Sequence, residues 1–301
     1  MKLMILGKNR TRCENKVVLF CIVFLIAISG SGCSHRKCKC LQADDRALAS
    51  SWMHNAVEYE YINKSTYTAA KTALIRALED TSVSASLEQE ETGGYENLPP
   101  AVILDLDETV INNGPFQGYM VKNKENYNPE LWKKWSDLKD AKPLAGAIDF
   151  LDFAIANGVT PIYVSNRIAA EEDNTIENLK TIGISTTREQ VLLKNEHEDW
   201  TSDKRTRREH VARQYRILLL LGDDLNDFVS VKGLNTNDRN EKSLPYINNF
   251  GDKWFILPNP SYGSWEPAVY GGHYPGEYGK EHKMRVDSLK TFVPAETNCK
   301  H

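Results

Sequence analysis

Apolar side chains recur along the chain in two different periods, and the first apolar segments predict helix. Between residues 46 and 78 they return near helical spacing. Residues 80–94 are polar, rich in Ser and Glu, and end in two glycines, which predicts a connection. We therefore expect a helical accessory region over residues 45–98, followed by a core over residues 99–301.

Short apolar runs alternate with helical patterns from residue 99 onward. Because the runs are apolar through most of their length, they predict parallel strands that helices cover on both faces. The predicted fold is α/β, a Rossmann-like parallel sheet. The expected strands are residues 101–106, 159–165, 190–193, 216–221 and 253–257, and the expected helices are residues 144–157, 169–181 and 203–215.

The beginning of the chain has the pattern of an export signal. A basic segment, residues 1–16, precedes an uncharged apolar run, residues 17–29, and small residues then lead to Cys33. The run is shorter than the about 20 apolar residues that a membrane-spanning helix needs. We predict a signal peptide over residues 1–32, and the alternative is an uncleaved N-terminal anchor.

Cys33 stands where bacterial lipoproteins carry the cysteine that is acylated after cleavage. The leader resembles theirs except at Gly30, where Leu is usual. The resemblance implies lipidation of Cys33, a tether over residues 33–44 and attachment to the membrane. Because Ser34 rather than Asp follows the cysteine, it also implies an exported lipoprotein of the bacterial outer membrane.

Charge and cysteine content narrow the function classes. The formal net charge is −4, and removal of the basic leader makes the remainder more acidic. An acidic body argues against general nucleic-acid binding, which needs clustered Lys and Arg. Outside the leader and Cys33 stand Cys38, Cys40 and Cys299. Two interpretations stay open: a disulfide from Cys38 or Cys40 to Cys299, and a partial metal site at the first two.

Carboxylates gather after two of the predicted strands. Asp105 and Asp107 lie in the segment DLDET, and Asp223 and Asp227 lie in GDDLND directly after residues 216–221. Sites in such sheets lie at the carboxyl ends of the strands, and carboxylate oxygens suit Mg²⁺. We predict that these four aspartates form a Mg²⁺ site, although each segment alone also fits a capped or acidic loop.

Phosphate-binding groups fall between the two acidic segments. Ser165 and Asn166 follow a strand and offer a hydroxyl and amides, and Lys204 begins a helix and offers an ammonium group. Each residue type is common at such a place. Because the arginines of RTRR follow Lys204, the lysine also fits a solvated basic helix face.

In chain order, DLDET, a strand-end Ser, a Lys and GDDLND resemble the motifs of the haloacid dehalogenase (HAD) superfamily of phosphohydrolases. The segments LWKKWSDLKDAKPLAGA, YVSNR and WFILPNPSYGSWE resemble the bacterial class C acid phosphatases, lipoproteins with four functional aspartates. The resemblance covers about residues 47–266. It implies a HAD-like core with a small cap, and Mg²⁺-dependent hydrolysis of nucleoside monophosphates and aryl phosphates at acidic pH. It further implies dimerisation.

The family's roles transfer position by position. The resemblance implies that Asp105 is the nucleophile that forms an aspartyl phosphate. Asp107 protonates the leaving group, then activates water, and lends its backbone carbonyl to the metal. Asp223 is the direct carboxylate ligand, and Asp227 supports it. The groups implied to hold the phosphoryl oxygens are Ser165, Asn166 and Lys204.

Two positions depart from the family pattern. Asn112 stands where Asp is frequent, and Asp224 stands where Asn is common after the metal-binding Asp. We expect the Asp224 carboxylate to point away from the metal.

Aromatic residues near the motifs bear on specificity. Trp132, Trp135 and Tyr262 are candidates for stacking on a base or an aryl ring. The alternative is that they pack within the core or the cap.

Two rival functions remain. A phosphotransferase on the same fold would keep Asp105 but change the acceptor, and product analysis separates the two. A non-catalytic surface lipoprotein would only bind a ligand or partner, and the intact aspartates argue against it.

Overall fold

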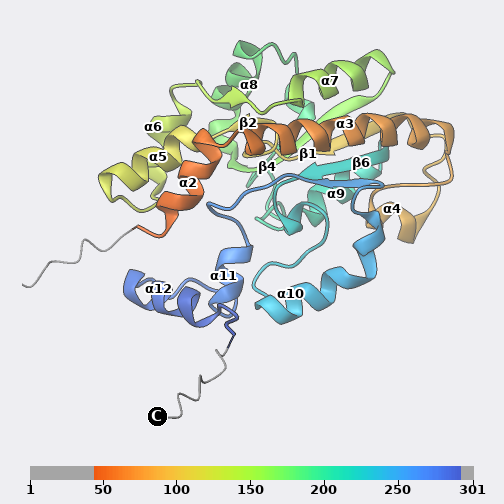
Figure 1. The fold of residues 1–301 in the computed structure, drawn as a ribbon. Helices are drawn as coiled ribbons and strands as arrows, with labels where there is room; N and C mark the ends of the chain where they lie inside the picture. The colour runs from red at the N-terminus through yellow and green to blue at the C-terminus, as the bar shows by residue number, and fades with distance from the viewer. Residues whose placement is uncertain (1–43, 293–301) are drawn as a thin grey trace, which may run out of the picture. The chain divides into compact units, whose positions relative to one another are not determined.

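The computed structural model describes residues 44–292, and a five-stranded sheet forms the centre of this part (Figure 1). The strand order is β5-β4-β1-β6-β7, and every neighbouring pair is parallel. This arrangement confirms the predicted α/β sheet. The strands are β1 (Pro100–Leu104), β4 (Thr160–Ile168), β5 (Val191–Lys194), β6 (Arg216–Gly222) and β7 (Trp254–Ile256).

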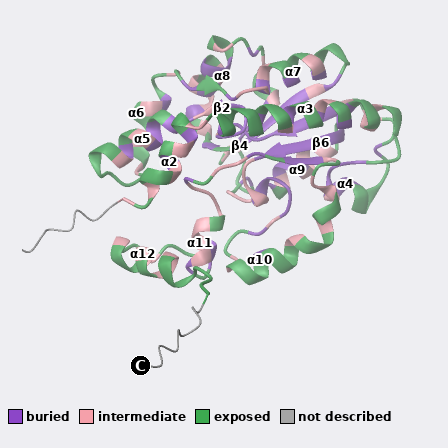
Figure 2. Cartoon of the chain, in the orientation of Figure 1, coloured by how far each residue is buried: buried purple, intermediate pink, exposed green. Residues whose placement is uncertain are grey.

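Alternate residues of β1 serve two hydrophobic cores on opposite faces of the sheet. Val102 packs in the cluster with α3 (Val57–Glu79) and α7 (Ala147–Ala156). Ile103 packs in the cluster with α9 (Arg205–Ala212). Side chains of a strand point alternately to its two faces, so a strand that is apolar throughout is covered on both. Figure 2 shows the buried strands between the helices.

The segment predicted to be helical over residues 46–78 consists of two helices. α2 (Arg46–Asn55) ends and α3 begins at Ala56, which has extended backbone angles. Alanine favours helix, so local propensity does not explain the break at this position. The predicted connection over residues 80–94 contains a further short helix, α4 (Leu87–Thr92), whose first turn Ser86 caps by accepting a hydrogen bond from Gln89 N.

The accessory helices are integrated with the sheet. The Tyr67 hydroxyl of α3 donates to the carbonyl oxygen of Thr109 at 2.8 Å, just after β1. The Trp254 indole of β7 donates to the carbonyl oxygen of Ala85 at 2.7 Å. The described residues belong to one compact unit.

The core helices fall close to their predicted ranges. α7 is followed by Gly158, whose φ of +75° is the left-handed conformation that glycine favours after a helix. α8 (Glu172–Thr181) and α9 are both shorter than the segments predicted for them.

A small insertion between two short strands covers the carboxyl end of β1. β2 (Ile111–Asn112) pairs antiparallel with β3 (Lys142–Pro143), and the chain between them forms α5 (Gly114–Asn123) and α6 (Pro129–Ser136). We call residues 114–141 the cap.

Three C-terminal helices have no counterpart among the predicted elements: α10 (Thr236–Ser243), α11 (Trp265–Val269) and α12 (Tyr278–Asp287). α12 is tied to the first described residues, because Arg285 pairs with Asp45 at 2.9 Å. Within residues 44–292 no helix combines the length and apolarity that crossing a membrane requires. The predicted signal peptide, Cys33 and the cysteines proposed to pair lie outside the described residues, so those expectations stay predictions.

Candidate active site

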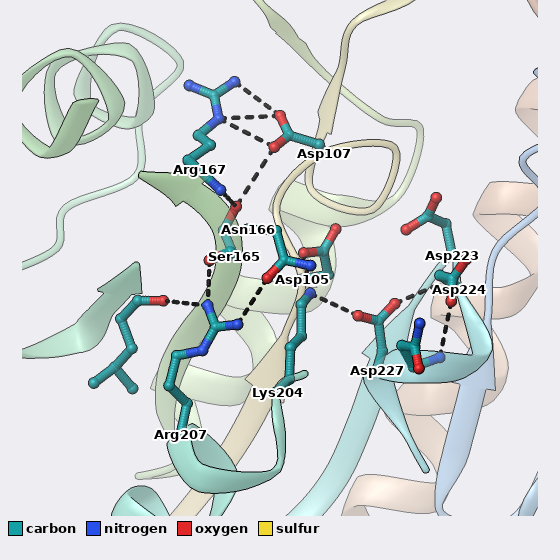
Figure 3. Close-up of polar contacts among 12 residues, drawn as sticks. Asp105, Asp107, Ser165, Asn166, Arg167, Lys204, Arg207, Asp223, Asp224 and Asp227 are labelled. Carbon is teal, nitrogen blue, oxygen red and sulfur yellow. Dashed lines mark hydrogen bonds and ion pairs between the residues drawn. The ribbon is translucent and has the colours of Figure 1, made fainter. Parts of the chain in front are cut away.

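Two neighbouring parallel strands bring the predicted carboxylates together (Figure 3). The backbone N–H of Asp105, just after β1, donates to the carbonyl oxygen of Leu221 in β6 at 2.9 Å, so the two strands end side by side. Carboxylate oxygens of Asp105, Asp223 and Asp227 lie within 4.8 Å of one another. The structure therefore gathers three of the four aspartates predicted to bind metal.

Lys204 lies inside this cluster. It precedes α9 and is buried, and its ammonium group contacts Asp105 and lies 2.6 Å from Oδ1 of Asp227. The interpretation of Lys204 as part of a solvated helix face is therefore wrong. The ammonium group stands beside the proposed nucleophile, where it can also reach a phosphoryl oxygen.

Burial and mutual repulsion raise the pKa values of the three carboxylates. Burial raises the pKa of Asp105 to about 7; the Lys204 ammonium opposes this shift, and the carboxylates of Asp227 and Asp107 add to it. Burial, followed by the nearby Asp105 and Asp227, also raises the pKa of Asp223 well above its usual value. Closely spaced carboxylates are stabilised in their charged form by a cation between them. The donor set, all carboxylate oxygens, fits a hard divalent cation such as Mg²⁺.

The loop after β6 depends on a glycine. A Cβ atom at Gly222 would lie 2.1 Å from Oδ2 of Asp227, far inside van der Waals contact. The same Oδ2 accepts a hydrogen bond from the backbone N–H of Asp224 at 2.9 Å. Gly222 thus provides the space in which the Asp227 carboxylate folds back over its own loop.

Two neighbours orient the rest of this loop. The Asp224 carboxylate accepts hydrogen bonds from the backbone N–H and the hydroxyl of Ser264, so it points away from the cluster, as expected. The side-chain amide of Asn259, just after β7, donates to Oδ2 of Asp223 at 2.8 Å. The sequence does not single out this second contact, because Asn259 lies three residues beyond the end of β7 in a polar loop.

The Asp107 carboxylate lies apart from the cluster and is paired with Arg167. The guanidinium group donates from Nη2 to Oδ1 of Asp107 at 2.8 Å and from Nε at 3.1 Å, and Arg167 is buried. The Ser165 hydroxyl lies 3.5 Å from Oδ2 of the same carboxylate. Arg167 is part of YVSNR, but sequence reasoning gave it no function. The alternation of side chains along a strand could have indicated this function, because it places residues 165 and 167 on the same side of β4.

Asn166 faces the other way, for the same reason. Its side-chain oxygen accepts a hydrogen bond from Nη2 of Arg207 at 2.7 Å, and its amide group donates to the carbonyl oxygen of Ser202 at 3.2 Å. The structure thus commits this side chain to a loop contact, and phosphate binding by Asn166 stays a prediction.

Two arginines of α9 are buried, contrary to their interpretation as a solvated basic face. Arg207 donates to the carbonyl oxygens of Ser165 and Thr201, which fixes the end of β4. Arg208 donates to the carbonyl oxygen of Asp227 at 3.2 Å and pairs with Glu88 of α4 at 2.8 Å. The segment from Lys204 through α9 therefore supplies one cation to the site and two to the loops that carry it.

We expect Glu88→Ala to lower the free energy of unfolding by about 3 kcal/mol, because it leaves Arg208 buried without its counter-ion. The Glu88 and Arg208 side chains are only 9% and 2% exposed. Urea denaturation of the variant measures the change.

The matched control is Glu209→Ala, which removes the partner of Arg205, an exposed arginine of the same helix. An exposed pair four residues apart on a helix contributes about 0.3–0.5 kcal/mol. Equal losses in the two variants would contradict the importance of the buried pair.

The two tryptophans predicted to stack on substrate contact other residues through their rings. Trp135 donates from its indole nitrogen to Oδ1 of Asn113 at 2.8 Å, and Trp132 lies under the guanidinium group of Arg167, 5.3 Å from the ring centroid. Tyr262 accepts through its backbone oxygen from the Trp265 indole at 3.1 Å. Substrate stacking by these rings stays a prediction.

The family comparison and two solved structures both indicate an acid phosphatase. Residues 29–265 match the profile of the HAD superfamily, subfamily IIIB (acid phosphatase). A structure of the class C acid phosphatase from Bacillus anthracis has a TM-score of 0.73 and 34% sequence identity, and the match covers 83% of this chain and 99% of that one. A second structure of that enzyme, with tungstate bound, has a TM-score of 0.72 and 34% identity, with 84% and 99% covered.

A curated relative is more distant. The stem 31 kDa glycoprotein of Glycine max is 30% identical over 167 residues, which are 53% of this chain and 58% of the relative. The chain thus spans less than two thirds of the length of that relative.

Proposed function

The chain belongs to the HAD superfamily, subfamily IIIB, a family of acid phosphatases, and from this premise we propose that it hydrolyses phosphomonoesters through an aspartyl phosphate on Asp105. The observation that carries the proposal is the buried cluster of Asp105, Asp223 and Asp227 around Lys204. Carboxylates placed to hold a metal ion, beside a cation, suit phosphoryl transfer, because the reaction depends on positioning and on charge stabilisation.

In the first step, an oxygen of Asp105 forms a bond to phosphorus while the bond from phosphorus to the ester oxygen breaks. Asp107 gives a proton to that leaving oxygen, so the alcohol departs neutral. Lys204 donates to a phosphoryl oxygen as charge builds up on it. The Ser165 hydroxyl, buried within β4, provides a second donor.

In the second step, water attacks phosphorus and the bond from phosphorus to the Asp105 oxygen breaks, which releases inorganic phosphate. Asp107, now ionised, takes the proton of the water. One carboxyl group serves both steps because they move the proton in opposite directions.

We propose Mg²⁺ as the cofactor, held by Asp105, Asp223 and the backbone carbonyl of Asp107, with Asp227 in support. The bound cation would offset the repulsion between the Asp105 carboxylate and the phosphate dianion. The carboxylate-only donor set supports Mg²⁺ over metals that favour nitrogen or sulfur.

Metal removal tests the proposal. We expect the chain to release phosphate from p-nitrophenyl phosphate and from nucleoside monophosphates, to lose this activity in excess EDTA, and to regain it with Mg²⁺. The readout is inorganic phosphate, because its release to water also distinguishes hydrolysis from transfer to another acceptor. Folded protein that releases none under any of these conditions would favour the non-catalytic alternative.

A further inference from the structure

Asp107 is held by groups that themselves depend on one helix of the cap. Oδ1 of Asp107 accepts hydrogen bonds at 2.8 Å from the Asn113 side-chain amide and from Nη2 of Arg167. Each of these donors contacts a different tryptophan of α6. Trp135 bonds to Asn113, and Trp132 lies under Arg167.

The spacing of the two tryptophans suits this arrangement. Residues three apart lie on one face of a helix, so Trp132 and Trp135 both point inward, while Lys133 and Lys134 between them are exposed. The start of α6 is fixed by Asn128, whose side chain accepts from the backbone N–H of Leu131 at 2.8 Å. The helix therefore presents both rings from a defined position.

The hydrogen bond from Trp135 helps to set which way the Asn113 amide points, together with the Glu108 carboxylate, which accepts from the same NH₂ group at 3.4 Å. An indole N–H can only donate, so the atom of Asn113 that faces it must be the carbonyl oxygen. The NH₂ group is then left to donate to Oδ1 of Asp107, which can accept this bond whether or not Oδ2 carries the proton. Asn113 is fully buried, so no solvent competes for these bonds.

We propose that Trp135 and Trp132 are positioning residues that hold Asp107 in the orientation in which it delivers a proton to the leaving oxygen. The proposal rests on the proposed function. It assigns the two rings to Asp107 rather than to the substrate. Loss of either ring should then slow hydrolysis most for substrates whose leaving group is strongly basic, because these depend most on proton donation.

Two aryl phosphates with similar rings separate the two assignments. Phenolate is a more basic leaving group than p-nitrophenolate, so phenyl phosphate depends more on proton donation, while both substrates offer an aryl ring for stacking. In the full-length chain, we expect Trp135→Phe to lower kcat/KM for phenyl phosphate by about tenfold, part of the about 10²–10⁴-fold that general acid catalysis contributes. The fall for p-nitrophenyl phosphate should be several times smaller.

Trp254→Phe is the matched control, because it also removes an indole N–H that donates to a buried acceptor, the carbonyl oxygen of Ala85. It should leave the ratio of the two kcat/KM values unchanged. Trp132→Leu should change the ratio in the same direction as Trp135→Phe. If the Trp135→Phe variant does not fold, the Trp132→Leu variant tests the assignment by itself.

Equal falls for both substrates, or no fall, would overturn the assignment, because stacking or a purely structural function predicts no change in the ratio. A wild-type chain that hydrolyses neither substrate would overturn the proposed function as well. An active wild-type chain whose variants keep the wild-type ratio overturns only the assignment of the tryptophans.

Discussion

Replacing Asp105 by Asn is expected to lower the rate of phosphate release by about 10⁴-fold or more, the scale seen when a covalent nucleophile is removed. Asparagine has nearly the shape of aspartate and can still accept a hydrogen bond from Lys204. Its amide oxygen is a poor nucleophile, so no aspartyl phosphate forms. The measurement is phosphate release at saturating p-nitrophenyl phosphate and Mg²⁺.

A trapping experiment and a control sharpen this result. Wild-type protein quenched in acid during turnover should carry a phosphoryl group that the Asp105→Asn variant lacks. Asp252→Asn makes the same chemical change in an exposed partner of Arg76 and should keep wild-type activity. Activity of the Asp105→Asn variant within about tenfold of wild type would exclude Asp105 as the nucleophile.

Gly222→Ala is expected to reduce kcat/KM by about 10²-fold, because a displacement of about 1 Å in a catalytic constellation costs that much. The added Cβ would lie 2.1 Å from Oδ2 and 2.5 Å from Cβ of Asp227, so the whole side chain must move. With it moves the carboxylate that contacts Lys204. The steady-state rate with p-nitrophenyl phosphate measures the loss.

Gly279→Ala is the corresponding control. Gly279 lies in α12, and a Cβ atom built there meets nothing within 4 Å. Alanine at a compatible position stabilises by about 0.4–1 kcal/mol through the unfolded state, so activity should be kept and stability slightly raised. A Gly222→Ala variant as active as this control would show that the loop tolerates displacement of Asp227.

The fold could be predicted because the strands are apolar along most of their length, which indicates that they are buried. β6 reads as an uninterrupted apolar run after Arg216, and such a run is buried whichever face it presents. The convergence of Asp105 with Asp223 also follows from pattern, since both stand directly after parallel strands, and these end at one edge of the sheet. Lys204 could be predicted only through its order among the motifs.

The remaining contacts depend on pairs that sequence pattern does not reveal. Arg208 and Glu88 lie 120 positions apart in the sequence, and each is a residue type that is usually exposed to solvent. Hydrophobic periodicity reports the burial of apolar side chains, so a cation that is buried because it is paired goes unnoticed. The hydrogen bond between Trp135 and Asn113 could not be predicted either. An aromatic residue near a site fits both packing within the protein and stacking on substrate, and the sequence does not distinguish the two.

The integration of α3 and α4 with the sheet has a consequence for the ancestry of this protein. Glu88 pairs with Arg208, and the carbonyl oxygen of Ala85 accepts the hydrogen bond from Trp254. A gene segment that starts at Pro100 would therefore encode a sheet that lacks two of its buried partners. Recombination is tolerated at boundaries that few contacts cross. A recombination boundary at Pro100 would cut both contacts, so we expect the helices and the sheet to be inherited together.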